Sequence, residues 1–331
     1  MCPIIKSGYD VNPKVTVLMS VYNGDRYLRE AIESILSQTF TDFEFLIVND
    51  GSTDSSKDII LTYNDSRIRL IDNGHNLGLT ASLNHGLDLA KGEYIARMDA
   101  DDISLPERLE KQVAFMDANN NIAVCGTCAE IINDKKERVG EFTNPELPDN
   151  IKTALFFFNP IAHPTVLMRK NIIIKAGKYN TEYLRTQDYE LWIRLFLSGH
   201  EFYNLQERLI IYRNHENNIT NSDLNNQLFY AEKSLQYLYK TYLNQNNFSF
   251  IKIFIQSLTS QSISISICMF FKFLFLLRKL KVRLQIDEKI HNFLWFNQIV
   301  EVIINKIKNA EDSNTRRYLM DRIIMVIGLY R

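Results

Sequence analysis

Between Val15 and Ala118 the chain alternates strictly between short apolar runs and longer amphipathic segments. The run VTVLMSV (15–21) is typical of a buried strand, and residues 25–37 carry apolar side chains at the 3.6-residue spacing of a helix. The same cycle predicts further strands at 43–48, 68–71 and 94–98, and further helices at 55–63, 79–90 and 106–118. Alternating strands and helices build βαβ units. We therefore predict an α/β fold with a Rossmann-like, mostly parallel sheet flanked by helices.

The pattern is less regular after residue 122. It predicts short strands at 123–126 and 130–133, a helix near 151–157, a helix at 188–197 and a last strand at 209–212. From about Leu224 onward, only helical patterns occur. We therefore expect two units, an α/β domain over residues 1–220 and an all-helical C-terminal region over residues 221–331.

The formal net charge of −1 argues against a general nucleic-acid binder, but the charge is unevenly distributed. Residues 251–331 hold 13 Lys and Arg against 6 Asp and Glu. Residues 251–283 form an apolar segment with a basic end, and its uninterrupted apolar stretches are too short to span a bilayer. This pattern fits a helix lying on an anionic membrane surface, and it equally fits a helix bundle packed within the protein or against a partner chain.

Four cysteines are too few and too scattered for a disulfide framework, which favours a reducing compartment. Cys125 and Cys128 have CxxC spacing, but no second ligand pair follows, so we interpret them as small side chains packed in a strand. The N-terminus lacks a basic stretch followed by an apolar one. We expect a cytoplasmic protein, either free or peripheral at the inner face of the cell membrane.

Three polar loops follow the predicted strands at 15–21, 43–48 and 94–98. They read SVYNG at 20–24, NDGSTD at 49–54 and DADD at 99–102. The carboxyl ends of parallel strands meet at one edge of a sheet, where ligands of such folds bind. None of the loops matches a GxGxxG or Walker A pattern, so neither a dinucleotide site nor an NTPase site is indicated.

The three aspartates of the DADD loop, Asp99, Asp101 and Asp102, repel one another unless a cation lies among them. Mg²⁺ or Mn²⁺ would resolve this repulsion, because hard cations take carboxylate oxygens and complete their shell with water and substrate phosphates. A metal–diphosphate site is therefore one interpretation. The other is a turn that caps the helix starting near Pro106, with Asp102 or Ser104 as the N-cap.

Three blocks of sequence resemble the family 2 glycosyltransferases, which use nucleotide-diphosphate sugars. The blocks are VTVLMSVYNGDRYLREAIESILSQTFTDFEFLIVNDGSTDSS, NLGLTASLNHGLDLAKGEYIARMDADD and TQDYELWIRL, and together they cover most of residues 15–200 in the order of the family. The resemblance implies the GT-A fold, with a mixed, mostly parallel sheet. It also implies an inverting, metal-dependent enzyme of the kind that builds bacterial polysaccharide and O-antigen.

The resemblance implies roles for individual residues of the donor site. Ser20 and Tyr22 match residues that hold the uracil, with the Tyr22 ring stacked on the base, and Asp50 matches the carboxylate that accepts from the base. Asp99 and Asp101 match the metal motif, with Asp101 as the direct ligand. Asn76 and Asn84 lie in a segment that often lines the donor pocket.

Asp188 aligns with the general base of the family. The preceding position holds Gln187 in place of the frequent Glu, so that neighbour is not a second carboxylate. Glu190 is the fallback base. The alternative for Asp188 is an ordinary helix N-cap, a position that Asp commonly fills.

Four further residues are candidates with roles left open. His163 resembles part of an HP(S/T) segment and is a candidate contact to donor or acceptor. His215 resembles part of a YR.H segment and is a candidate ligand of the metal or diphosphate, with Arg213 as a phosphate partner. Asp102 either contacts the sugar or caps the next helix.

The leading hypothesis is transfer of a sugar from a UDP-sugar to a saccharide or lipid-linked acceptor, with Mn²⁺ or Mg²⁺ as cofactor. A nucleotidyltransferase is the alternative within enzymes, but it would need a Gly-rich or Lys-containing loop after the first strand, which is absent. A non-catalytic scaffold at the membrane is the other alternative, and the intact aspartates argue against it. The sequence favours no nucleic-acid partner, and self-association stays open.

Overall fold

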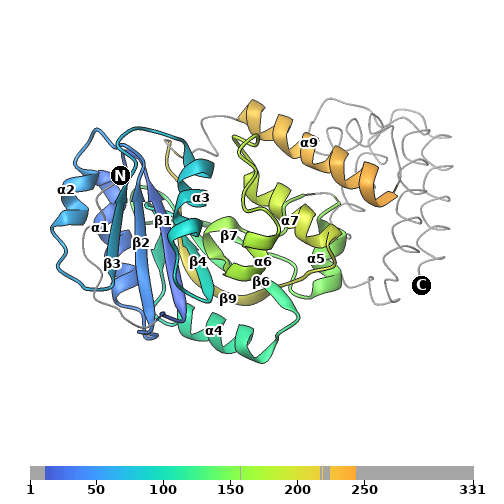
Figure 1. The fold of residues 1–331 in the computed structure, drawn as a ribbon, viewed down its shortest axis with the longest axis horizontal. Helices are drawn as coiled ribbons and strands as arrows, with labels where there is room; N and C mark the ends of the chain where they lie inside the picture. Colours follow the sequence, from blue (N-terminus) through green and yellow to red (C-terminus); the bar gives the residue numbers. More distant parts are fainter. Residues whose placement is uncertain (1–11, 157, 217, 219–223, 244–331) are drawn as a thin grey trace. The chain divides into compact units, whose positions relative to one another are not determined.

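The computed structural model describes residues 12–156, 158–216, 218 and 224–243 (Figure 1). The chain divides into two compact units, Met1–Ser234 and Leu235–Arg331. The described part of the second unit is the end of one helix, α9 (Leu224–Leu243). The predicted domain boundary at residue 220 and the apolar–basic segment 251–283 both lie outside the described residues, so these two predictions stay untested. No described helix has the length and apolarity needed to cross a membrane.

One mixed sheet organises the first unit, in the order β3-β2-β1-β4-β8-β6-β9-β5, with β7 paired to β6. Its strands are β1 (Val15–Val21), β2 (Phe43–Asn49), β3 (Ile68–Asp72), β4 (Tyr94–Met98), β5 (Ile103–Ser104), β6 (Ile122–Ile132), β7 (Arg138–Phe142), β8 (Leu167–Arg169) and β9 (Glu201–Arg213). The first four strands are parallel, β8 is antiparallel to both β4 and β6, and β9 is parallel to β6. The predicted α/β class with a mixed, mostly parallel sheet is confirmed.

Helices connect these strands. They are α1 (Asp25–Leu36), α2 (Ser56–Leu61), α3 (Leu79–Leu89), α4 (Arg108–Ala118), α5 (Pro148–Ala154), α6 (Lys170–Lys175) and α7 (Gln187–Leu197), with a 3₁₀ turn, η1, at His163–Thr165. The predicted start of a helix at Pro106 is wrong, because residues 103–104 pair with β9 as the short strand β5 and the helix begins only at Arg108.

The second half of the sheet differs from its prediction. The two short strands expected at 123–126 and 130–133 are one continuous strand, β6, and the last strand, β9, is much longer than expected. Both differences have one cause. β6 and β9 pair along almost their whole length, and register shifts at Thr127, Cys128 and Ala129 absorb the irregularity that breaks the sequence pattern.

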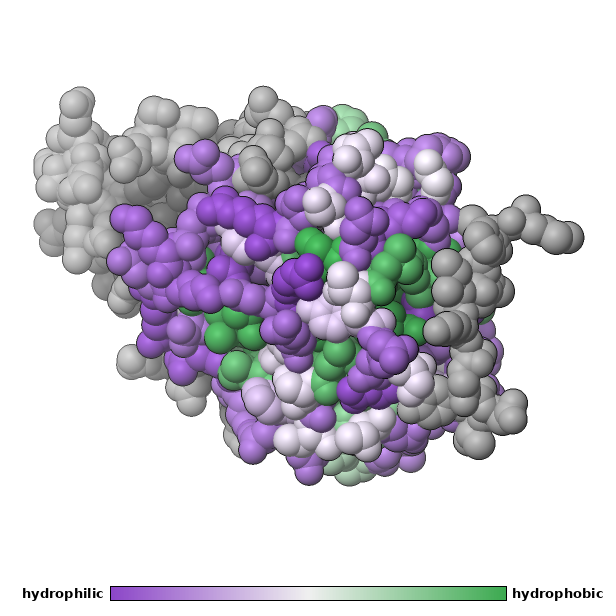
Figure 2. All heavy atoms as spheres, turned by 90° about the vertical axis from the view of Figure 1, so that its left-hand side faces the viewer, coloured by the Kyte–Doolittle hydropathy of each residue, from purple (hydrophilic) through white to green (hydrophobic). Residues whose placement is uncertain are grey.

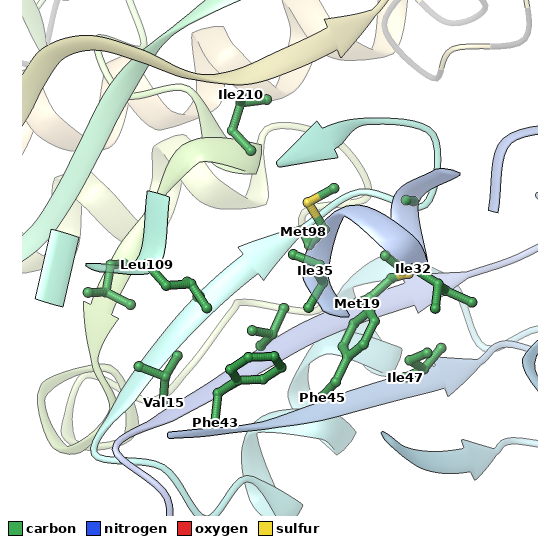
Figure 3. Close-up of a cluster of buried hydrophobic side chains, with 14 of the residues drawn as sticks. Val15, Met19, Ile32, Ile35, Phe43, Phe45, Ile47, Met98, Leu109 and Ile210 are labelled. Carbon is green, nitrogen blue, oxygen red and sulfur yellow. The ribbon is translucent and has the colours of Figure 1, made fainter. Parts of the chain in front are cut away.

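The hydrophobic core lies between the parallel strands and their helices (Figure 3). Phe43 and Phe45 of β2 share one buried cluster with Ile32 and Ile35 of α1. Burying each such side chain contributes about 1.5–3 kcal/mol, so this cluster fixes the parallel strands rigidly. The loops at their carboxyl ends are thereby held in fixed positions. On the side of the molecule where α2 lies, the surface is mainly hydrophilic with small, separate apolar groups (Figure 2).

The CxxC cysteines are packed inside this sheet. Cys125 and Cys128 are free and buried on β6. Burial raises the pKa of the Cys125 thiol to about 12, which keeps it protonated and unreactive. Among the described residues the one group with metal-ligand spacing is acidic and contains neither cysteine. This agrees with the interpretation of the pair as packed strand residues.

Candidate active site

The three polar loops meet at one edge of the sheet. In the parallel register Val21 lies opposite Asn49, and Met19 lies opposite Met98, so β1, β2 and β4 end side by side. Hydrogen bonds join the first two loops directly. Asn23 accepts from the Thr53 amide at 2.8 Å through its side-chain oxygen, and its own amide donates to the Ser52 hydroxyl at 3.1 Å. These bonds fix the loop that carries Tyr22.

The residues predicted to hold the nucleotide base occupy this edge. Ser20 is half-buried at the end of β1, and Tyr22 follows it with 49% of its surface exposed. An exposed ring beside a rigid loop is available for stacking. The predicted uracil contacts of Ser20 and Tyr22 stay predictions.

Asp50 is buried and organises the next loop along the chain. Its Oδ1 accepts from the Asn73 amide group and from the Leu77 backbone, both at 2.9 Å, and its Oδ2 accepts from the Gly78 backbone at 2.9 Å. Asn76 lies in this loop, exposed, and also accepts from the Gly78 amide. A carboxylate offers about four acceptor positions, so Asp50 retains capacity for one more donor.

Gly51 makes the close packing of these loops possible. Its φ of 69° lies in the left-handed region, and a Cβ at this position would lie 2.4 Å from backbone atoms of His75. A side chain here would push the segment containing Asn76 away from Asp50. Asn84 donates to the Tyr179 carbonyl at 2.8 Å and accepts from the Tyr179 amide at 3.0 Å, and its place in the donor pocket stays a prediction.

The DADD loop forms a cluster of carboxylates. Asp99, Asp101 and Asp102 each offer an oxygen, and these atoms lie within 4.8 Å of one another. His215 lies beside them, with its Nε2 at 3.0 Å from Oδ2 of Asp101. The structure therefore brings together all the residues that the sequence proposes as metal ligands.

Asp102 is not a helix cap. The residue that caps α4 is Glu107, and no side chain makes a capping hydrogen bond there. Asp102 is instead fully buried and accepts from the Arg213 backbone at 2.9 Å through Oδ1. Its Oδ2 is also buried, and it has no hydrogen-bond partner among the described residues. The end of strand β9 is thus hydrogen-bonded to the acidic loop.

The electrostatics of the cluster fit a divalent cation. Burial raises the pKa of Asp99, an effect opposed by its ion pair with Arg97 and increased by Asp101. Burial also raises the pKa of Asp102 well above its ordinary value, and Asp101 and Asp99 add to this rise. Hard oxygen donors, an imidazole and an unpartnered buried carboxylate oxygen together form a donor set that suits Mg²⁺ or Mn²⁺.

Arg213 anchors the acidic loop. Its Nε donates to the Asp101 carbonyl at 3.0 Å, a terminal nitrogen lies 2.6 Å from Glu30, and the guanidinium stacks over the Tyr27 ring. The side chain is 1% exposed. A contact between Arg213 and phosphate stays a prediction, and this packing disfavours it because Arg213 would have to leave Glu30.

Asp188 lines the same cavity as the acidic cluster. This cavity has a volume of about 370 Å³, and its walls include Asp99, Asp101, Asn159, His163 and Asp188. Asp188 is 9% exposed, and its Oδ2 accepts from Nδ2 of Asn159 at 2.7 Å. Burial raises the pKa of its carboxyl, and the Asn159 hydrogen bond opposes this shift.

The helix α7 presents Asp188 to the cavity. The N-cap of α7 is Thr186, in a left-handed conformation with φ 53°, so Asp188 is the second residue of the helix and the N-cap alternative is wrong. A threonine with this φ is strained, which marks a turn held by its surroundings. The fallback base, Glu190, forms a two-contact ion pair with Arg194 at 2.6 and 2.8 Å.

His163 is buried and neutral. Its Nε2 lies 2.8 Å from the Tyr179 hydroxyl, and burial lowers its pKa well below the ordinary histidine value, with the nearby Arg97 adding to this effect. The imidazole lies in the cavity wall, so its predicted contact with donor or acceptor stays open.

Comparison with known proteins identifies the class of protein that carries this site. The model of "Glycosyl transferase family 2" matches residues 16–175. The O-antigen biosynthesis glycosyltransferase WbnJ of Escherichia coli is 35% identical over 221 residues, which cover 63% of this chain and 83% of WbnJ. The chain belongs to glycosyl transferase family 2. A second glycosyltransferase, the uncharacterized MJ1057 of Methanocaldococcus jannaschii, is 37% identical over 255 residues, covering 74% of this chain and 87% of that protein.

The fold of this glycosyltransferase has a solved counterpart. A crystal structure of Staphylococcus aureus TarS 1-349 in complex with UDP-GlcNAc aligns with a TM-score of 0.58 at 18% identity, covering 89% of this chain and 81% of TarS. At this identity the likeness concerns the fold alone. It agrees with the GT-A architecture that the sequence motifs imply.

Several residues of the glycosyltransferase site escaped the sequence analysis. Arg97 lies on β4, is buried, forms an ion pair with Asp99 and lines the cavity. Asn159 bonds Asp188, and Tyr179 bonds His163. Arg97 could have been found from the sequence, since a charged residue within a predicted buried strand requires a partner. No sequence pattern marks Asn159 or Tyr179, because only the tertiary fold brings them to the site.

Proposed function

We propose that this family 2 glycosyltransferase is an inverting, metal-dependent enzyme that transfers a sugar from a UDP-sugar to a saccharide or lipid-linked acceptor in the synthesis of cell-surface polysaccharide. One observation carries the proposal. Asp188 lines the same cavity as Asp99 and Asp101, so a candidate base and the candidate metal carboxylates face one space. Its volume of about 370 Å³ is within the range of small-ligand sites. The role of WbnJ in O-antigen biosynthesis and the UDP-GlcNAc bound to TarS support the substrate class.

The donor nucleotide is proposed to bind at the ends of β1 and β2. Tyr22 stacks on the uracil, Ser20 contacts it, and Asp50 accepts from its N3–H with the acceptor capacity that the loop contacts leave. Asn76, in the loop that Asp50 holds, lines the ribose side. The hydrogen bonds between the loops support this assignment, because a preorganised site binds without an ordering cost.

The diphosphate is proposed to lie at the acidic cluster. Asp101, Asp99 and His215 would hold Mn²⁺ or Mg²⁺, and a bound divalent cation would neutralise the charge that develops on the leaving diphosphate. Asp102, buried beside these ligands, would fix the acidic loop through its hydrogen bond with the Arg213 backbone. Arg97 keeps Asp99 in place through their ion pair.

Asp188 is proposed as the general base. The bond between the anomeric carbon and the diphosphate oxygen breaks, and its electron pair leaves with UDP. An acceptor hydroxyl oxygen forms the new bond on the opposite face and gives its proton to Asp188. An α-linked donor thus yields a β-linked product. The ion pair between Glu190 and Arg194 makes Glu190 a poor competitor for this role.

We also propose that the enzyme works in the cytoplasm, at or near the inner face of the cell membrane, where a lipid-linked acceptor would be presented. The basic residues that follow the apolar part of segment 251–283 support this location. Self-association is compatible with it, and the net charge of −1 favours no nucleic-acid partner.

Incubation with a panel of UDP-sugars tests the proposal. We expect metal-dependent UDP release from at least one of UDP-glucose, UDP-galactose, UDP-GlcNAc and UDP-GalNAc, with water as the acceptor, and a β-configured product by NMR. An α-configured first product would contradict the inverting mechanism. Release from GDP- or dTDP-sugars alone would contradict the donor assignment.

A further inference from the structure

The carboxylate of Asp188 has a specific partner from another part of the chain. Nδ2 of Asn159 donates to Oδ2 of Asp188 at 2.7 Å. Asn159 lies in the loop before η1, whereas Asp188 lies in the first turn of α7, and both residues line the cavity. A hydrogen bond to a charged group is about twice as strong as a neutral one. The partner therefore restricts the rotation of the carboxylate.

The Asn159 amide is itself held in one orientation. The backbone N–H of Ile161 donates to Oδ1 of Asn159 at 3.3 Å. A backbone N–H can only donate, so its partner is the amide oxygen and the NH₂ group is the one that faces Asp188. Pro160, between the two, is buried and has a fixed φ. The loop thus presents an amide donor to the cavity before any ligand binds.

We propose that Asn159 is a positioning residue for sugar transfer, holding Oδ2 of Asp188 so that the other oxygen, Oδ1, takes the proton of the acceptor hydroxyl. The inference rests on the proposed function, since it requires Asp188 to be the base. Asn159 acts through Asp188 and not on the substrate.

The surroundings of Asp188 fix the direction of the pH effect. Burial raises the pKa of Asp188, whereas the Asn159 hydrogen bond, a backbone hydrogen bond from Tyr189 and the charge of Arg97 lower it, in decreasing order of effect. The other ionisable groups of the cavity come from separate elements. They are Asp99 and Asp101 after β4, His163 of η1, Arg185 before α7 and Tyr212 of β9. Tyr179 is also close enough for its pKa to be raised by Asp188, in addition to a larger effect of burial.

The loss of Asn159 therefore raises the pKa of Asp188. A general base works only when it is ionised, so the rate falls as the pH decreases through this pKa. Without Asn159 the acid limb of the pH–rate profile moves to higher pH, by about one pH unit for a lost hydrogen bond to a charged group. A residue that only stabilised the 159–163 loop would lower the melting temperature and leave the acid limb in place.

The test compares Asn159→Ala and Asn159→Asp with the full-length parent. UDP release from the UDP-sugar that the parent hydrolyses fastest is measured against pH, together with UDP affinity in Mn²⁺ and the melting temperature. The matched control is Asn121→Ala, which also removes an amide donor from a carboxylate, Glu201 at 2.6 Å, outside the cavity. We expect Asn159→Ala to lower kcat about tenfold or more, to shift the acid limb upward and to keep UDP affinity.

Asn159→Asp should shift the acid limb further, because two carboxylates in contact share a proton. An unshifted acid limb in both Asn159 variants overturns the proposal, whatever happens to the melting temperature. Asp188→Asn, measured in parallel, distinguishes a failure of the base assignment from a failure of the role proposed for Asn159. Transfer at the parent rate by Asp188→Asn overturns the assignment of the base itself. Lost transfer in Asp188→Asn with an unshifted limb in Asn159→Ala overturns only the role of Asn159.

Discussion

The Nε2 atom of His215 lies 3.0 Å from Oδ2 of Asp101, although one residue follows the last strand of the sheet and the other follows β4. Arg213 explains this proximity. Its backbone donates to Asp102 and its guanidinium to the Asp101 carbonyl, so the end of β9 is fastened to the acidic loop. The Tyr27 ring packs against the His215 ring, with 5.0 Å between the ring centroids. A candidate metal ligand is thus supplied by a distant segment and fixed by packing.

His215→Ala should weaken Mn²⁺-dependent UDP binding roughly tenfold, because the candidate metal site loses its imidazole ligand while the carboxylates remain. Titration calorimetry with UDP in Mn²⁺ measures the effect. His200→Ala is the control, because this histidine follows α7 and does not line the cavity. Equal UDP affinity in the two variants would remove His215 from the metal site.

Asp188→Asn should lose transfer by about 10²- to 10⁴-fold and keep UDP binding. The same variant should be more stable than the parent at pH 7. The folded-state pKa of Asp188 is raised by burial, so the ionised carboxylate opposes folding above the unfolded pKa, and the neutral amide removes this cost. Thermal unfolding at pH 7 measures the gain in melting temperature.

Glu190→Gln should have the opposite effects on stability and transfer from those of Asp188→Asn. It breaks a buried ion pair with Arg194 while leaving Asp188 intact, so stability should fall and transfer by the remaining folded enzyme should persist. Loss of transfer in Glu190→Gln with retained transfer in Asp188→Asn would reassign the base to Glu190.

Gly51→Ala should destabilise the protein by about 3 kcal/mol or more, for two reasons. The new Cβ would clash with the His75 backbone, and the left-handed φ of this position is unfavourable for alanine. Gly74→Ala separates the two effects. Gly74 has a φ of 75° but open space around its Cβ, so its cost should be only the conformational one of about 1–2 kcal/mol. Urea unfolding measures both variants, and equal free energies of unfolding would contradict the role of the close contact.

Replacing Arg278, Lys279, Lys281 and Arg283 by serine should weaken binding to anionic liposomes. Each basic residue near such a surface contributes about 1 kcal/mol, so the loss should be large and should decrease at high salt. Cosedimentation with phosphatidylserine vesicles measures it, with neutral vesicles as the control. Unchanged cosedimentation would favour the alternative in which this segment packs as a protein core.

The sequence predicted the parallel half of the sheet because its signals are local. The apolar runs of β1 and β2 and the helical spacing of α1 each lie within a short window, and the strand order places their loops together. The second half of the sheet, which mixes parallel and antiparallel pairs, depends on pairing between distant segments. β8 is three residues long and β5 only two, and neither has a pattern that separates it from a loop.

The same distinction applies to the site. Asp99, Asp101 and Asp188 lie in motifs that can be read along the chain, whereas the partners that orient them come from elsewhere. Asn159 meets Asp188, and Glu30 of α1 meets Arg213, only after folding. The sequence pattern places Arg213 beside His215 and so predicts a phosphate contact for its guanidinium. The pattern does not reveal that Glu30 is the partner of this guanidinium in the folded protein.

Titration of UDP into the full-length protein, with Mn²⁺ and with EDTA, tests the central claim most directly. The account predicts UDP binding in Mn²⁺ that is at least tenfold weaker in EDTA, and a loss of this metal dependence in Asp101→Ala. Equal UDP affinity in Mn²⁺ and EDTA, or an Asp101→Ala variant that keeps the parent's metal dependence, would contradict it.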